Sequence, residues 1–228
     1  MDFIDVGDPR PRVPLLPFER FEFEFSSRYY LPISRETQLI DFFKVVMNRR
    51  SRRSFMPLDC KALGALLWHS NKTISQKELG NGHVWQHRPT PSAGGRHPID
   101  LLIFSADGGA HVYDPIAHAL DKLSTEMAES LSILKGKALE IVGVRDATVI
   151  YFIAHIAYLS GAYTEATSLI YRDAGALGAT MALVSEALGL NFCILGNTGE
   201  PFVSRAFASI GKLHGVGACL VGFRGDDS

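Results

Sequence analysis

The sequence predicts a mixed α/β or α+β fold, because short apolar segments typical of strands alternate along the chain with segments of helical spacing. The chain has 228 residues, enough to bury a substantial core in one domain or two small ones. Hydrophobic residues make up 46% and charged residues 21%, as in an average globular protein. This composition excludes long disorder, a collagen-like repeat and a coiled coil.

Charge and cysteine content restrict the partners and the compartment. The 23 lysines and arginines nearly balance 24 acidic residues, so the net charge of -1 predicts no nucleic-acid partner and no anionic membrane. Cys60, Cys193 and Cys219 lie far apart without a CxxC pair, which is typical of a cytoplasmic protein. The N-terminus has no signal-peptide pattern. The most apolar stretch, Ala147–Tyr163, is too short for a membrane span.

The first 33 residues are expected to form an arm and a strand that precede a main domain of residues 34–228. Residues 1–17 are rich in proline, which predicts an extended arm. Phe21, Phe23 and Phe25 then alternate with Glu22 and Glu24, the period of a strand with one buried face. An arm and strand of this kind often pack on a partner subunit.

Two helices are expected next. The segment Glu36–Val46 has helical spacing, with Ser34 as its N-cap. Its apolar side chains fall on one face, namely Leu39, Phe42, Phe43 and Val46. The segment Cys60–Ser70 predicts a second helix capped by Asp59, and the polar residues 71–91 that follow predict a loop.

The rest of the chain is expected to alternate between strands and helices. The apolar stretch Ala147–Tyr163 predicts a buried strand that leads into a helix. The other expected elements are strands over Ile99–Ser105 and His111–Asp114, a helix over Leu120–Leu134, a long helix over Tyr163–Leu188 with Gly189 as its C-cap, an apolar turn over Asn191–Asn197, and a strand over Gly217–Phe223.

The densest charge run in the chain follows the first expected helix, at residues 49–53. In an extended segment, residues two apart point the same way, so Arg49, Ser51 and Arg53 could converge on one phosphate while Arg50 and Arg52 face elsewhere. Guanidinium groups bind phosphate through two parallel hydrogen bonds, and a hydroxyl adds another donor. The alternatives are a solvated basic turn and a nucleic-acid or localisation patch.

A proline- and glycine-rich loop precedes the strand at Ile99. Gly94 and Gly95 allow the backbone to approach a ligand without a Cβ in the way, and the backbone N–H groups there could bind a flat polar heterocycle. The alternative is an ordinary turn. Neither a P-loop nor a GxGxxG fingerprint after a strand is present.

Small residues cluster in the long helix, from Asp173 to Thr180. They predict either a tight subunit interface or a closely packed core helix. The apolar residues 191–197 that follow could cover one face of a ring. His83 and His87 flank Trp85 in a polar segment, but no HExxH or cysteine partner accompanies them, so no metal site is expected.

Taken in order, these segments resemble the flavin-dependent nitroreductase superfamily. Residues 49–55, Arg-Arg-Ser-Arg-Arg-Ser-Phe, resemble its RxSxR phosphate-binding segment. Residues 91–98, Pro-Ser-Ala-Gly-Gly-Arg-His-Pro, are similar to the PSxG loop of one branch, the streptolysin- and microcin-type dehydrogenases that oxidise azolines in ribosomal peptides. Further segments in register are Tyr113-Asp114-Pro115 with His118, Asp173 to Leu190, Cys193 to Gly196, and Val221 to Arg224.

The resemblance implies an α+β, three-layer fold with a central, mainly antiparallel sheet flanked by helices. It also implies an intertwined homodimer that binds FMN at the subunit interface. The implied phosphate ligands are Arg49, Ser51, Arg53 and Arg224, with Arg50 as a further contributor. From the partner subunit, Ser92, Ala93 and Gly94 would reach the flavin. The implied ring contacts are Ile194, Leu195 and Gly196, with Asp173 at the start of the helix.

The resemblance further implies an FMN-dependent oxidoreductase, a dehydrogenase or oxidase of a peptide-derived or other heterocyclic intermediate, within a biosynthetic complex. Azoline oxidases typically carry an adjacent Lys-Tyr before the small-residue helix, whereas this chain has Ala162-Tyr163. Either Tyr163 alone is the catalytic proton-transfer group, or the substrate is not an azoline. The alternatives are an NAD(P)H-dependent nitro or quinone reductase and a catalytically inactive scaffold subunit.

Overall fold

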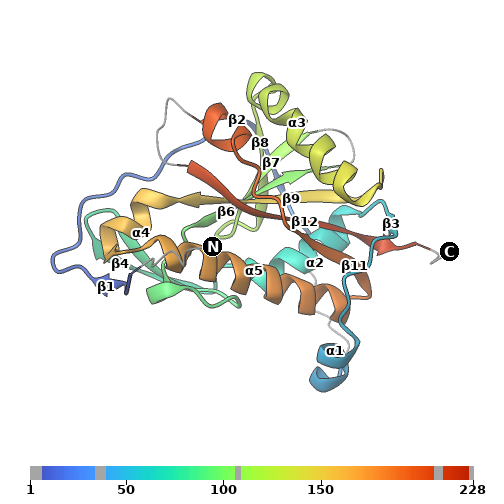
Figure 1. The fold of residues 1–228 in the computed structure, drawn as a ribbon, viewed down its shortest axis with the longest axis horizontal. Coiled ribbons are helices and arrows are strands. Elements are labelled where there is room, and N and C mark those ends of the chain that lie inside the picture. The colour runs from blue at the N-terminus through green and yellow to red at the C-terminus, as the bar shows by residue number, and fades with distance from the viewer. Residues whose placement is uncertain (1–6, 34–39, 106–108, 208–212, 226–228) are drawn as a thin grey trace, which may run out of the picture.

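The computed structural model describes residues 7–33, 40–105, 109–207 and 213–225. It confirms the α+β class: a large antiparallel sheet lies between helices on both faces, in three layers (Figure 1). None of the helices in these ranges is long and apolar enough to cross a membrane.

Helices of the described residues are α1 (Phe42–Asn48), α2 (Cys60–Asn71), α3 (Thr125–Val142), α4 (Ile156–Ala162), α5 (Thr167–Ala187) and α6 (Phe202–Ala206), with a 3-10 turn η1 (Ala93–Gly95). The strands are β1 (Arg10–Pro11), β2 (Phe25–Tyr30), β3 (Phe55–Met56), β4 (Ser75–Gly80), β5 (His83–His87), β6 (Ile99–Phe104), β7 (Ala110–Asp114), β8 (Ala119–Leu123), β9 (Thr148–His155), β10 (Tyr163–Thr164), β11 (Leu190–Leu195) and β12 (Leu213–Arg224).

The main sheet has the strand order β11-β12-β9-β6-β7-β8-β2, and β3 pairs with the end of β12. Every pairing in it is antiparallel. Two short ladders lie outside it: β1 pairs with β10, and β4 pairs with β5. The first of these joins the N-terminal segment to the strand that carries Tyr163.

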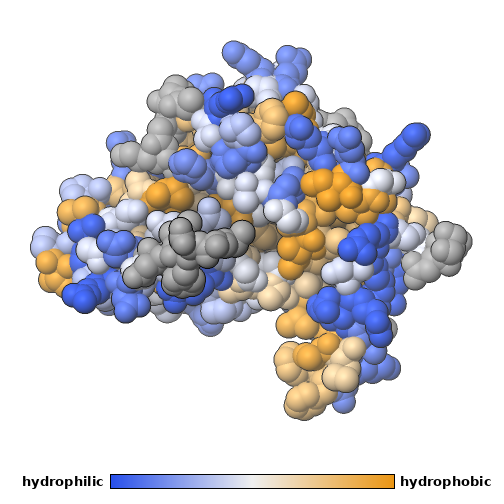
Figure 2. All heavy atoms as spheres, in the orientation of Figure 1, coloured by the Kyte–Doolittle hydropathy of each residue, from blue (hydrophilic) through white to orange (hydrophobic). Residues whose placement is uncertain are grey.

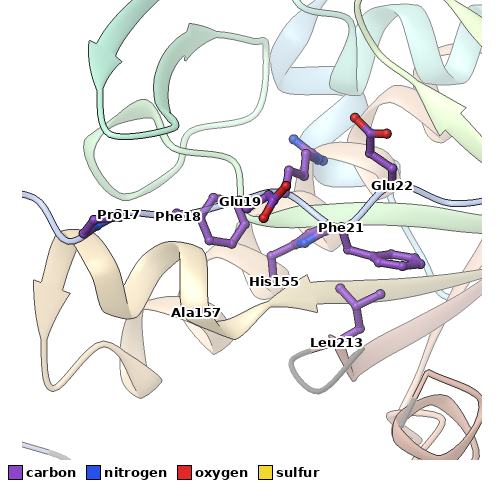
Figure 3. Close-up of a pocket in the computed structure, with 9 residues that line it drawn as sticks. Pro17, Phe18, Glu19, Phe21, Glu22, His155, Ala157 and Leu213 are labelled. Carbon is purple, nitrogen blue, oxygen red and sulfur yellow. The ribbon is translucent and has the colours of Figure 1, made fainter. Parts of the chain in front are cut away.

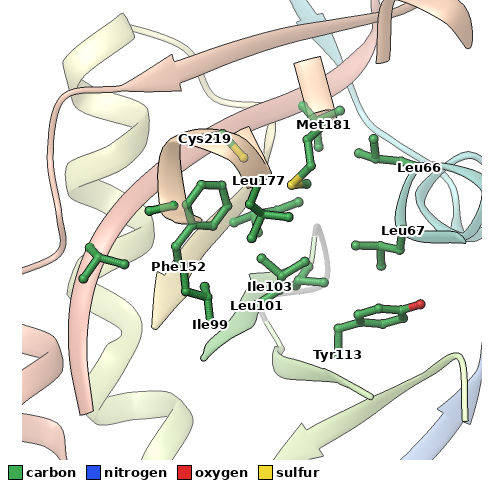
Figure 4. Packing of buried hydrophobic residues seen from close by; sticks show 14 of the residues in the cluster. Leu66, Leu67, Ile99, Leu101, Ile103, Tyr113, Phe152, Leu177, Met181 and Cys219 are labelled. Carbon is green, nitrogen blue, oxygen red and sulfur yellow. The ribbon is translucent and has the colours of Figure 1, made fainter. Parts of the chain in front are cut away.

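The central strands are apolar without alternation because both of their faces are buried. Leu101 of β6 faces Phe152 of β9 in one core, under α2 and α5, where Leu66, Leu177 and Met181 meet them (Figure 4). Leu102 pairs with Tyr151 and points into the opposite core, against α3. Burying a side chain of this size contributes about 2 kcal/mol, so this pair of strands anchors both layers.

Most of the predicted elements are confirmed. The helix from Cys60 is capped by Asp59, whose carboxylate accepts from the N–H of Ala62 at 2.7 Å. The long helix starts at Thr167 instead of Tyr163, which lies in β10, and it ends before Gly189 as expected. Gly189 has the positive φ of 70° that a glycine C-cap provides. The stretch from Ala147 contains β9 followed by α4.

Three predictions in the middle and C-terminal parts of the chain are wrong. The expected loop at 71–91 contains the β4–β5 hairpin. The expected helix Leu120–Leu134 is a strand, β8, followed by a helix that starts at Thr125, because Ser124 caps α3 through the N–H of Met127. The expected turn at 191–197 is largely strand β11.

The N-terminal predictions also need correction. Among Phe21, Phe23 and Phe25 only the last belongs to a hydrogen-bonded strand, while the first two pack against Phe207. Helix α1 starts at Phe42, because the Asp41 side chain accepts from the backbone N–H groups of residues 43 and 44. The expected cap Ser34 and Leu39 lie outside the described residues.

Candidate functional site

Helix α5 joins two groups of predicted site residues at its opposite ends (Figure 1). Asp173, nearer its start, contacts the glycine-rich loop of residues 91–98. Glu186, near its end, contacts the arginine segment, residues 49–53. At 1.5 Å per residue the two acidic residues lie about 20 Å apart along the helix axis. One chain therefore holds the two groups rigidly but does not bring them together.

In the N-terminal third of α5, Asp173 clamps the loop that precedes β6. Its carboxylate accepts from the Ser92 hydroxyl at 2.6 Å and from the Ala93 N–H at 3.0 Å. The Ser92 oxygen in turn accepts from the N–H of His97 at 2.8 Å. Burial raises the pKa of Asp173, and the bonds from Ser92 and Ala93 oppose that rise. The Ser92 hydroxyl thus donates to Asp173 and accepts from His97, and these bonds hold the loop in one conformation.

The same loop passes closely under two aromatic side chains. Gly94 has φ 59°, and a Cβ there would collide with the Tyr163 hydroxyl. Gly95 has φ 62°, and a Cβ there would meet the indole nitrogen of Trp85. Both positions need glycine for backbone conformation and for space. Tyr163, Ser92, Ala93 and Gly94 thus form one cluster, the loop cluster.

At the other end of α5, the arginine segment presents a cationic surface. Arg49, Arg50, Ser51 and Arg53 are exposed, and the described residues offer these arginines no ion pair. Arg52 instead points inward and forms an ion pair with Glu186.

Strand pairing brings a further arginine to this surface. Arg224 of β12 is the register partner of Phe55 in β3, and its guanidinium lies 3.3 Å from Glu186. A single carboxylate, whose side chain is only 9% exposed, therefore faces two arginines here. The surplus positive charge and the Ser51 hydroxyl fit a phosphate group.

The predicted ring contacts lie in β11 and the turn after it. Ile194 is exposed and packs over Gly178, where an added Cβ would approach its Cδ1 to 3.2 Å. Gly196 is exposed, whereas the Leu195 side chain is buried in the core under α3. Ile194 and Gly196 present the small apolar surface that a flat ring needs, and Leu195 offers its backbone only. The arginines and Ser51 thus fit the phosphate of FMN, and Ile194 and Gly196, further along β11 and its turn, fit its ring.

Sequence reasoning missed a buried polar network beneath the N-terminal segment. Asp100 forms an ion pair with Arg20, and its other oxygen lies 2.6 Å from His155 Nε2. Arg88 is buried nearby, donates to Gln86 and Asn71, and has a pKa lowered to about 10, chiefly by burial. Only charged residues within or beside apolar strands could have signalled this network, and that signal is weak.

A cavity of about 510 Å³ lies over this network, between the N-terminal segment and β9 (Figure 3). Phe18, Phe21, His155 and Leu213 line it. Its histidine is committed to Asp100, and Phe18 packs edge-on against the imidazole. The cavity belongs to the attachment of the N-terminal segment and contains none of the predicted site residues.

The histidines near Trp85 have structural surroundings. His83 Nε2 lies 2.9 Å from the Leu16 carbonyl oxygen, and its ring stacks on Tyr158. Within the ranges that the structure describes, no group of three or more His, Cys, Asp or Glu side chains could hold a metal ion.

Comparison with known proteins adds a decisive observation to this geometry. The model of the nitroreductase family, described as "Nitroreductase family", matches residues 46–223 of the chain. These residues include the arginine segment, the loop cluster and nearly all of the main sheet. The chain belongs to the nitroreductase family. No curated protein matches this member of the family.

Solved nitroreductase structures share the fold. A putative nitroreductase from Ralstonia eutropha JMP134 superposes with a TM-score of 0.67 at 19% identity, covering 94% of this chain and all of the other. A putative nitroreductase from Desulfovibrio desulfuricans, solved in complex with FMN, gives 0.52 at 20% identity and covers 84% and 92%. The Escherichia coli microcin synthetase McbBCD complex with truncated pro-MccB17 bound gives 0.56 at 16% and covers 86% and 78%.

Proposed function

We propose that this nitroreductase-family protein is an FMN-dependent oxidoreductase. The observation that carries the proposal is the exposed cationic surface of Arg49, Ser51, Arg53 and Arg224, together with the exposed apolar side chain of Ile194 further along β11. The arginines and the serine would hold the FMN phosphate, with Arg50 as a further donor. Ile194, Gly196 and the backbone of Leu195 would cover the ring. The FMN bound by the Desulfovibrio relative supports this choice of cofactor.

We propose that the protein acts as a homodimer, with FMN between the subunits. In one chain the arginine surface and the loop cluster are about 20 Å apart along α5, so a second copy would supply Ser92, Ala93 and Gly94 to the flavin. Helix α1 supports this arrangement. It projects from the body with Phe42, Phe43 and Met47 exposed, an apolar surface visible in Figure 2.

The proposed reaction is the dehydrogenation of a peptide-derived or other heterocyclic intermediate. FMN, when bound, would supply hydride acceptance at its ring N5. Tyr163 would hold or move the substrate proton through its hydroxyl, which lies against Gly94, and Asp173 would keep the loop in place. The similarity of the fold to that in a microcin synthetase complex supports a peptide substrate and a biosynthetic partner.

The purified, concentrated chain tests the proposal directly. Flavin absorbance bands, and FMN as the cofactor released on denaturation, are the expected result. A colourless protein that also fails to take up added FMN would reject the oxidoreductase and leave the scaffold subunit. If the protein binds FMN, rapid turnover of a nitroaromatic or quinone with NADPH would instead establish the reductase alternative.

A further inference from the structure

The segment that leads into β2, residues 19–24, has no backbone partner. Phe18 before it donates its N–H to the Asn81 carbonyl oxygen at 3.0 Å, and Phe25 after it belongs to β2, but the backbone groups between them bond to no described residue. Phe21 and Glu22 leave the segment in opposite directions, as successive side chains of a strand do (Figure 3). A strand-like segment with unpaired backbone groups is a template for pairing with another extended chain.

Open space lies along this segment. A cavity of about 440 Å³ separates it from the start of α3, and the apolar lining includes Phe21, Phe23 and Met127. The two phenylalanines are only half-buried, although both pack against Phe207, so part of each ring is accessible. The cavity of about 510 Å³ described above also has Phe21 and Glu22 in its lining. Room for a ligand therefore follows the whole segment.

The charged lining of the smaller cavity is entirely negative. Glu22, Glu24 and Glu126 line it, are exposed, and form no ion pair with a described residue. No lysine, arginine or histidine is among the described residues around this cavity. We call it the acidic groove. Glu22 and Glu24 are two residues apart, so in a strand-like segment they point to the same side, and a paired chain presents its side chains to them with the same period.

We infer that the acidic groove binds an extended segment of the peptide substrate, which pairs with residues 19–24 as an added strand and carries lysine or arginine at alternate positions. In this binding mode the backbone bonds give affinity and the alternate side chains give specificity. Apolar residues between the basic ones would contact Phe21 and Phe23. The inference rests on the proposed function, which makes the substrate peptide-derived. None of the predicted site residues lines the groove, so it would hold a part of the substrate remote from the reacting ring.

The dimensions of the groove favour a single chain over a folded partner. Six residues of strand are about 20 Å long, which matches the length of residues 19–24. A peptide of that length brings only its own side chains into the groove. The edge strand of a folded partner would also bring its neighbouring strand, about 4.8 Å away, toward α3.

The test measures the binding of short peptides to the full chain by fluorescence anisotropy, with and without added FMN. The probes are fluorescein-labelled (Lys-Val)₃ and (Glu-Val)₃ peptides. We expect the lysine peptide to bind at least about tenfold more tightly at low salt. The double variant Glu22→Gln/Glu24→Gln should weaken its binding about fivefold. The control Glu78→Gln/Glu140→Gln removes the same charge from exposed residues of β4 and α3 outside the groove, and should leave binding unchanged.

Strand pairing is tested separately from charge. Two further lysine peptides carry backbone N-methyl groups, one on all its lysines and the other on all its valines. An added strand turns the N–H groups of alternate residues toward its partner, so one of these peptides should lose binding and the other should keep it. An equal effect of both methylation patterns would reject the added strand.

Other outcomes would overturn the rest of the inference. One is equal binding of the lysine and glutamate peptides, and another is full affinity in Glu22→Gln/Glu24→Gln. Equal or tighter binding of the lysine sequence held in a β-hairpin would assign the groove to a folded partner. A chain that elutes as a dimer and binds neither peptide would have its groove covered by the second copy. A chain that binds no FMN would reject the proposed function, whereas the peptide preference of the flavin-free chain would still report on the groove.

Discussion

His155 Nε2 lies 2.6 Å from a carboxylate oxygen of Asp100, inside the protein, and both side chains are less than 8% exposed. The other oxygen of Asp100 binds Arg20, which enters from the N-terminal segment. Burial tends to raise the pKa of Asp100, but Arg20 and His155 outweigh it and hold the pKa well below its usual range. The Arg20–Asp100 ion pair thus fastens the N-terminal segment to β6, and the contact of Asp100 with His155 joins β6 to β9.

Replacing Asp100 should destabilise the fold. Asp100→Asn leaves Arg20 and the buried His155 without their carboxylate, so the free energy of unfolding in urea should fall by about 3 kcal/mol at neutral pH. Asp146→Asn removes an exposed aspartate in the turn before β9 and should change it by less than about 0.5 kcal/mol. Equal effects of the two substitutions would contradict a stabilising role for the pair.

The lowered pKa of Asp100 predicts how the free energy of unfolding depends on pH. The pKa of Asp100 is lower in the folded protein than in the unfolded chain, so its contribution is fully present above the unfolded value of about 4. The contribution is lost as the pH falls below that value toward the folded pKa. The stability difference between the unaltered protein and Asp100→Asn should therefore shrink in acid. A difference that grows in acid would show that Asp100 is not ionised in the fold.

Gly94→Ala should be destabilising because of its backbone conformation and because of the Tyr163 hydroxyl. We expect a loss of about 2 kcal/mol, part of which Tyr163→Phe should restore in the double variant by removing the colliding oxygen. Gly175→Ala is the matched control. That glycine lies in α5 with open space around it, so alanine should stabilise the fold by roughly 0.5–1 kcal/mol. Thermal or urea unfolding measures all four proteins.

Two adjacent arginines should have separable roles. Arg52→Gln removes one of the two arginines that face Glu186, so the free energy of unfolding should fall by about 2 kcal/mol. Arg53→Gln should leave stability within about 0.5 kcal/mol but weaken FMN binding about tenfold, measured by fluorescence titration. If Arg53→Gln affects only stability, the phosphate assignment is wrong.

The cysteines should differ in reactivity. Cys60 is exposed, whereas Cys193 and Cys219 are buried, and burial raises the pKa of Cys219 well above its usual value. A thiol reagent should modify Cys60 quickly in the native protein and the other two only in urea. Fast modification of all three without denaturant would contradict the packing of β11 against β12.

The sequence predicted elements well where one signal dominated, and failed where two signals overlapped. In residues 119–134 the buried strand β8 has no alternation, so its leucines continue the helical spacing of α3, and only Ser124 marks the boundary. The β4 residues are all exposed and, apart from Leu79 and Gly80, polar, which conceals a strand. The Asn81-Gly82 pair, with φ of 52° and 75°, was the available hairpin signal.

For the site, the sequence identified segments but not their arrangement. It predicted that Arg49, Ser51 and Arg53 point one way while Arg50 and Arg52 face elsewhere. In the structure Arg52 turns inward to Glu186, whereas Arg50 is exposed like the other three. It did not predict the distance between the arginine surface and the loop cluster, which the length of α5 sets. Arg96 stands within a recognised motif, but only tertiary packing reveals that its Nε and Nη1 atoms are buried without a hydrogen-bond partner among the described residues.

Helix α5 also fixes the relative orientation of the loop clamp and the arginine surface. Each residue of an α-helix turns the chain by about 100° and advances it by about 1.5 Å. An insertion of one residue between Asp173 and Glu186 would therefore swing the loop clamp away from the arginine surface, while both ends could still fold locally. Point substitutions on the outer face of α5 leave this phase unchanged. Over evolutionary time the segment should accordingly accept exchanges of residues but not changes in length.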